Sequence, residues 1–220
     1  MHPPLTDVEV RVLGSLVEKE ATTPDNYPLS LSALTAACNQ TSNREPVMRL
    51  DEDSVMSAVV SLRRRSLVRA MQQAGSRVTK YNHLLVDTLN LDPRELAVMG
   101  VLMLRGAQTP GELHARTARL AEFADLGEVE KTLDALITRE PEAFVVRLPR
   151  RPGQKEVRYA HFLSGEVVPA DAPEAPGAWA APGAQADDER VAALERAVDE
   201  LRSELATLRA QFVEFRAQFQ

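Results

Sequence analysis

The sequence has little cysteine and few aromatic residues. Its 220 residues include one cysteine, Cys38, and 5% phenylalanine, tryptophan and tyrosine together. A single cysteine excludes an intramolecular disulfide and any cysteine-based zinc cluster. With so few rings, the cores must be built mainly from leucine, valine, alanine and methionine. No apolar run approaches the 20 residues of a transmembrane helix and no signal peptide is evident, so we expect a cytoplasmic protein without a membrane partner.

Enzyme motifs are also absent. There is no glycine-rich phosphate loop, nucleophile elbow or paired-histidine metal motif. His83 and His161 each follow a tyrosine by two residues, and we interpret them as structural side chains of equivalent strands. Cys38 lies on an apolar helix face and is expected to be buried. We therefore predict a protein that is not an enzyme, with no catalytic residues, no metal and no cofactor.

What the sequence does contain is an internal repeat. Residues 9–24 and 95–110 share seven identical pairs at an offset of 86: Glu9/Glu95, Val12/Val98, Gly14/Gly100, Leu16/Leu102, Ala21/Ala107, Thr23/Thr109 and Pro24/Pro110. A second repeated motif relates residues 75–85 to residues 153–163. Two repeated motifs in the same order indicate tandem duplication of a module of about 75–85 residues.

Each copy is predicted to contain three helices followed by a β-hairpin. In the first copy, Thr6 and Glu9 form a capping box for a helix that ends near Glu20. Ser30 begins the second helix, and either Asp51 or Asp53 begins the third. Residues 67–72 and 78–84 then alternate as paired strands.

The second copy repeats this order. Asp92 and Pro93 begin its first helix, Thr109 its second, and the third starts near Gly127. Residues 143–148 and 156–162 are predicted to pair as the second hairpin. Three helices and a hairpin are typical of the winged helix, a helix-turn-helix variant. The predicted fold is thus mainly α with small β-hairpins: tandem winged-helix domains in residues 1–88 and 89–164, followed by a C-terminal coiled-coil helix.

The C-terminal quarter has a different character. Residues 165–187 are rich in proline and alanine, which predicts a linker. Residues 188–220 carry an apolar heptad typical of a coiled coil. The predicted dimerisation residues are Val191, Leu194, Val198, Leu201, Leu205, Leu208, Phe212 and Phe215. We expect a homodimer, although the same helix could instead pack against its own domains.

Basic residues are concentrated in two segments, although the whole chain has a net charge of −6. Residues 39–82 contain eight basic and four acidic side chains, and residues 147–161 contain five and one. Arginine and lysine clusters of this kind can bind phosphates. The predicted contacts to double-stranded DNA are Arg44, Ser57, Ser61, Arg63, Arg64, Arg65, Arg77, Lys80, Arg150, Arg151 and Lys155.

Two observations oppose sequence-specific DNA reading. The third helix of the first copy begins with the acidic run of residues 51–53, and its counterpart carries Glu128, Glu130 and Asp134. Arginines at a helix end can also simply satisfy its carbonyls and dipole. The main hypothesis is a transcriptional or nucleoid-associated regulator. The alternative is a protein–protein adaptor that uses the same modules and the coiled coil without DNA.

Four segments of the sequence resemble the YceH family of bacterial proteins over about residues 5–165. They are RVLGSLVEKEATTPDNYPLSLSALTAACNQTSNREPVM, GSRVTKYNH, RGAQTPGEL and LPRRPGQKEVRYAH. The resemblance implies a pair of winged-helix domains and no settled activity, and it leaves out the linker and the coiled coil. It marks Asn39, Gln40, Ser42, Asn43, Arg44 and Pro46 as either a shared surface or a hydrogen-bonded loop that holds the third helix.

Overall fold

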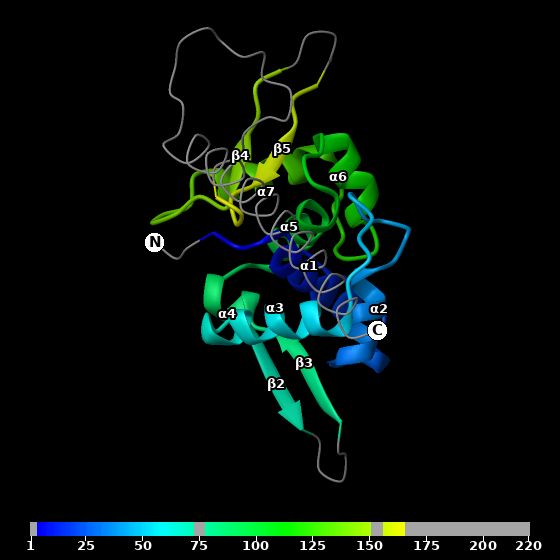
Figure 1. Ribbon diagram of the computed structural model, residues 1–220. Coiled ribbons are helices and arrows are strands. Elements are labelled where there is room, and N and C mark those ends of the chain that lie inside the picture. Colours follow the sequence, from blue (N-terminus) through cyan, green and yellow to red (C-terminus); the bar gives the residue numbers. More distant parts are fainter. Residues whose placement is uncertain (1–3, 73–77, 151–155, 166–220) are drawn as a thin grey trace, which may run out of the picture. The chain divides into compact units, whose positions relative to one another are not determined.

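The computed structural model of the chain describes residues 4–72, 78–150 and 156–165 (Figure 1). All of these residues belong to one compact unit. It is mainly helical, with small antiparallel sheets. The predicted coiled coil and almost all of the predicted linker lie outside the described residues, as do Arg77, Arg151 and Lys155. The domain boundaries at residues 88 and 164 also stay predictions.

The first module follows the predicted order of elements. It contains α1 (Asp7–Thr22), α2 (Leu31–Cys38), α3 (Glu52–Arg64), β2 (Val68–Gln72) and β3 (Thr79–His83). The capping box of Thr6 and Glu9 is present, Ser30 caps α2, and Asp51 rather than Asp53 caps α3. The β2–β3 hairpin extends away from the helices beyond α3 (Figure 1).

Three short elements were not expected from the sequence. A 3₁₀ turn spans Pro24–Asn26, β1 (Leu29–Ser30) pairs with β3, and α4 (Leu85–Leu89) follows the hairpin. The sheet order is β1-β3-β2, with Val68 opposite His83 in the hairpin. A two-residue strand carries no periodicity, and α4 has no side-chain cap, so neither leaves a signal in the sequence.

The second module has the same order. It contains α5 (Pro93–Arg105), α6 (Pro110–Thr117), α7 (Leu126–Ile137), β4 (Val145–Arg147) and β5 (Tyr159–His161). Capping boxes formed by Asp92 with Glu95 and by Thr109 with Glu112 begin α5 and α6. The strands are shorter than predicted, with Val145 opposite His161.

Glycines at equivalent positions in the two modules allow α1 and α5 to pack closely. Helices α1 and α5 pack against each other at the centre of the unit (Figure 1). A Cβ at Gly14 would lie 3.0 Å from Met103 Cβ, and a Cβ at Gly100 would lie 2.8 Å from Val17 Cγ1. Gly14 and Gly100 are equivalent in the repeat, and so are Val17 and Met103. The modules therefore meet through the same face of the same helix, as in a two-fold symmetric interface.

The polar segment between α2 and α3 is a hydrogen-bonded loop, one of the two interpretations left open by the sequence. The Asn39 side chain donates to the Leu50 carbonyl and accepts from the Leu50 amide, both at 2.7 Å. This pair closes the loop one residue before the Asp51 cap. The Glu45 amide donates to the Leu104 carbonyl at the end of α5. The loop therefore positions α3 and also joins the two modules.

Candidate nucleic-acid interface

Helix α3 turns a polar face with a basic end to solvent. Val55, Val59 and Leu62 are fully buried, as the sequence predicted. The opposite face exposes Ser57, Val60, Arg63 and Arg64. The amphipathic spacing thus leaves the two C-terminal arginines free of the core. Glu52 and Asp53, at the other end of the same face, are also exposed.

A shallow groove of about 480 Å³ separates α3 from β2, and we call it the α3–β2 groove. Its lining residues are Val60, Arg63, Arg64, Ser66, Val68, Arg69, Ala70 and Leu84. Three of these side chains are cationic and none is acidic. Within the described residues, Arg63, Arg64 and Arg69 make no ion pair with a carboxylate. The groove therefore presents cations to solvent without internal neutralisation.

Arg44, one of the predicted DNA contacts, lies inside the protein instead. Its side chain is fully buried and forms a two-pronged ion pair with Glu18, at 2.8 and 3.1 Å. It also donates to the Ala37 carbonyl at the end of α2. Burial alone would raise the pKa of Glu18, but Arg44 and Lys19 hold that pKa below its usual value. Arg44 therefore links α1, α2 and the loop, and it is not part of the candidate interface.

Arg65 and Ser61 also face inward, toward the start of α1. The Arg65 guanidinium lies 3.9 Å from the Glu9 carboxylate, and the Ser61 hydroxyl hydrogen-bonds the same carboxylate. Burial would raise the pKa of Glu9, yet the hydrogen bonds of Ser61 and Thr6 and the charge of Arg65 lower it. Arg65 is therefore at least partly a structural residue.

Two further predicted contacts are described on the hairpins. Lys80 is half-buried on β3, opposite Met71 of β2. Arg150 is exposed just after β4. The structure brings neither residue into the α3–β2 groove, whereas it adds Arg69, which the sequence prediction omitted. Arg69 is exposed on β2, and its place in a basic hairpin is the signal that could have identified it.

The equivalent surface of the second module is different. Helix α7 exposes Glu130, Lys131 and Asp134. Arg139, just after α7, is held by Glu95 at 2.9 Å and lies over the Phe144 ring. The exposed side chains of α7 thus include one cation and two acids, unlike the lining of the α3–β2 groove. The repeat thus conserves the scaffold while the outward faces diverge.

The lone cysteine is a buried side chain. Cys38 is fully buried, as predicted, and burial raises the pKa of its thiol.

In the described ranges, no group of three or more histidine, cysteine, aspartate or glutamate side chains could hold a metal ion. In the same ranges, no helix has both the length and the apolar character to cross a bilayer.

The chain belongs to a family of bacterial proteins that have no assigned function. Residues 5–154 match the family described as Protein of unknown function, DUF480. A UPF0502 protein of Vibrio vulnificus strain YJ016 is 51% identical over 215 residues, which cover 96% of this chain and 97% of the relative. A UPF0502 protein of Geobacter sulfurreducens is 50% identical over 218 residues, or 98% of both chains.

These alignments extend further than the motifs that carry the family resemblance. A third relative, a UPF0502 protein of Herminiimonas arsenicoxydans, is 47% identical over 211 residues, 96% of this chain and 89% of its own. Coverage of 96% cannot be reached without residues beyond 165. The similarity therefore includes part of the segments predicted as linker and coiled coil.

Proposed function

We propose that the protein is a non-enzymatic DNA-binding protein, a transcriptional or nucleoid-associated regulator built from two winged-helix domains. The observation that carries this proposal is the α3–β2 groove. Three arginines line it without internal ion pairs, between the third helix and the first strand of the hairpin. In a winged helix these two elements face the duplex: the helix enters the major groove and the hairpin contacts the backbone.

The chemistry of the groove suits backbone phosphates. Arginine forms two-pronged, charge-assisted hydrogen bonds with phosphate oxygens. Ser57 and Val60 lie on the same exposed face, where a hydroxyl can contact base edges and an apolar side chain can contact a thymine methyl. The acidic first turn of α3 keeps that end of the helix away from phosphates. We therefore expect modest sequence preference and strong dependence on salt.

A charge-reversal experiment tests this proposal. Fluorescence anisotropy of the full chain with a random-sequence duplex should show binding that weakens steeply as salt rises. Arg63→Glu combined with Arg64→Glu should abolish binding at low salt, because two phosphate contacts are replaced by repulsion. In a milder variant, Arg64→Gln should lower the salt slope by about 1.

A matched control is available on the equivalent helix of the second module. Arg64→Glu and Lys131→Glu change the charge equally, and both side chains are exposed. Only the first should weaken binding, by about tenfold or more. Equal losses in both variants would show that net charge, not the groove, governs binding. Unchanged binding in the double charge reversal would refute the assigned face.

One observation favours a protein–protein adaptor as the second candidate. The exposed acidic side chains of α7, Glu130 and Asp134, suit a basic protein partner better than DNA. No DNA binding by the full chain at low salt, with a partner captured through α7 and lost on Glu130→Lys, would favour the adaptor.

A further inference from the structure

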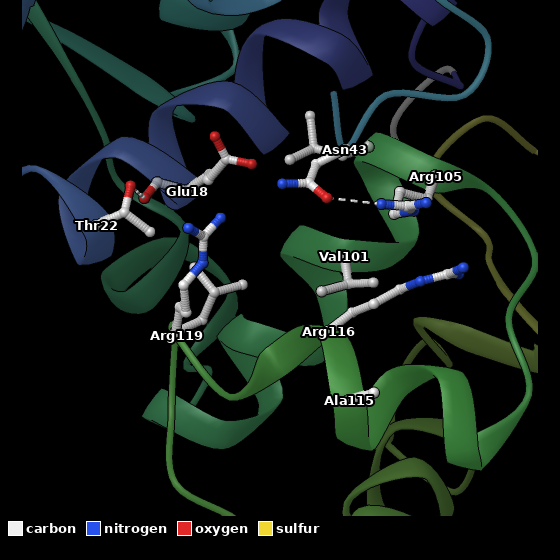
Figure 2. A pocket seen from close by; sticks show the side chains of 10 residues that line it. Glu18, Thr22, Asn43, Val101, Arg105, Ala115, Arg116 and Arg119 are labelled. Atoms are coloured by element: carbon white, nitrogen blue, oxygen red, sulfur yellow. Dashed lines mark hydrogen bonds between the residues drawn. The ribbon is translucent and has the colours of Figure 1, made fainter. Parts of the chain in front are cut away.

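A second group of arginines lines a pocket where the two modules meet (Figure 2). We call it the arginine pocket, and it has a volume of about 230 Å³. Its walls come from α1, the loop before α3, α5, and the segment from α6 to Leu120. The lining residues are Glu18, Thr22, Asn43, Val101, Leu104, Arg105, Ala115, Arg116, Arg119 and Leu120. None of them lines the α3–β2 groove.

The three arginines differ in how they are held. Arg105 donates to the Asn43 side chain at 2.7 Å, which fixes its guanidinium at one wall. Arg116 is 3.9 Å from Glu112, a distance too long for a hydrogen bond. Arg119 makes no hydrogen bond or ion pair with another described residue, and its guanidinium points toward Glu18 (Figure 2).

The acidic side chains nearby are already neutralised. Glu18 is paired with Arg44 and with Lys19, at 2.8 and 3.0 Å. Glu112 is paired with Arg158 at 2.9 Å. Burial would raise the pKa of Glu112, but a hydrogen bond from Thr109 and the charges of Arg158 and Arg116 lower it. The positive charge of Arg116 and Arg119 therefore remains available to a ligand.

The volume of the pocket indicates the size of that ligand, and the lining residues indicate its chemistry. The pocket is smaller than the roughly 300–1,000 Å³ that drug-sized molecules occupy. Val101, Leu104 and Leu120 give part of the lining an apolar character beside the arginines. Guanidinium groups match the oxygens of a phosphate group.

We propose that the arginine pocket binds the phosphate group of a small molecule, held by Arg116 and Arg119 with Arg105 at the far wall. Both modules line the pocket, because Thr22 and Asn43 belong to the first and the three arginines to the second. Binding therefore stabilises the packing of the two modules. This site is independent of the DNA-binding proposal.

Calorimetry and thermal unfolding of the full chain test the site with orthophosphate and pyrophosphate, at ionic strength matched with chloride. We expect pyrophosphate to bind and to raise the midpoint of unfolding by a few degrees at about 100-fold excess over Kd. Arg119→Gln and Arg116→Gln should each weaken binding by about tenfold or more. Arg64→Gln, in the other basic site, is the matched control and should bind pyrophosphate normally.

A variant that keeps every arginine tests the site separately from any effect that the loss of an arginine has on folding. Ala115 is exposed at the pocket, and Ala115→Glu places a negative charge there, so it should remove pyrophosphate binding and leave unfolding without ligand unchanged. Absence of binding to either phosphate by the wild-type chain would overturn the proposal. Equal weakening in Arg64→Gln would overturn the location. Malonate binding as tightly as pyrophosphate would overturn the phosphate assignment.

Discussion

Single residues repeat their roles in both modules. Glu9 and Glu95 each complete a capping box at the start of the module's first helix. Each also faces an arginine that follows the third helix, with Glu9 3.9 Å from Arg65 and Glu95 2.9 Å from Arg139. One carboxylate thus joins the beginning of the first helix to the end of the third. This double role explains why the glutamate is identical in the two repeats.

Arg44 should be the arginine whose loss most destabilises the protein. Arg44→Met would leave Glu18 buried without its main cation and the Ala37 carbonyl without its donor. We expect a loss of about 3–5 kcal/mol in the free energy of unfolding, measured by urea denaturation. Arg64→Met, at an exposed site, should change it by less than about 0.5 kcal/mol. A loss below 1 kcal/mol for Arg44→Met would contradict this account.

His161 should make the protein less stable in mild acid. Burial lowers the pKa of His161 to about 4, with Asp7 opposing the shift, whereas the unfolded value is near 6.5. Between these values the unfolded chain binds a proton that the native state excludes, so stability falls as pH drops from 6.5 toward 4. Because the side chain is partly exposed, we expect about 1–3 kcal/mol from this residue.

The substitution His161→Gln isolates this effect. Urea denaturation of both proteins at pH 7 measures the change in packing alone. At pH 4.5 the difference between them should shrink, or reverse, because glutamine does not titrate. A difference that stays constant over this range would show that His161 is not responsible.

At the scale of elements, the contact between α1 and α5 joins the two modules. Glycine inside a helix is unfavourable by about 1 kcal/mol relative to alanine, so two glycines at equivalent positions need a reason. The close approach of Met103 and Leu104 to Gly14, and of Val17 to Gly100, supplies it.

Gly14→Ala should therefore lower stability despite alanine's better helix propensity. Its Cβ would lie 2.9 Å from Leu104 Cγ and 3.0 Å from Met103 Cβ, so the helices must separate. We expect a net loss of about 1–3 kcal/mol by chemical denaturation. Gly111→Ala is the control: no atom lies within 4 Å of the added Cβ, so stability should stay equal or rise by up to about 1 kcal/mol. If both variants changed the stability in the same direction, tight packing would be refuted as the role of Gly14.

At the scale of the whole molecule, the proposed function depends on how many groove surfaces act together. A protomer offers one α3–β2 groove, and a dimer would offer two. Two linked grooves would bind DNA more tightly than one, because the second contact becomes intramolecular. The predicted coiled coil of residues 188–220 would supply the link.

Leu201→Asp combined with Leu208→Asp should therefore produce a monomer. Both leucines occupy predicted heptad d positions, where a carboxylate cannot be buried. Sedimentation velocity should show a dimer for the wild type and a monomer for the variant, and DNA affinity should fall roughly tenfold or more. A wild-type chain that is monomeric at micromolar concentration would refute this dimer.

The sequence alone determined where the main helices begin and that the chain is duplicated. Caps such as Thr6 with Glu9 and Thr109 with Glu112 act across three residues, so they can be read locally. Only the tertiary structure decided which arginines are available. Arg44 meets Glu18 from 26 positions away, and Arg105 meets Asn43 from 62, whereas Arg64 and Arg119 meet no described carboxylate. Burial and pairing depend on which distant segments pack together. The residues within one helical turn of an arginine do not determine which distant segment it will meet.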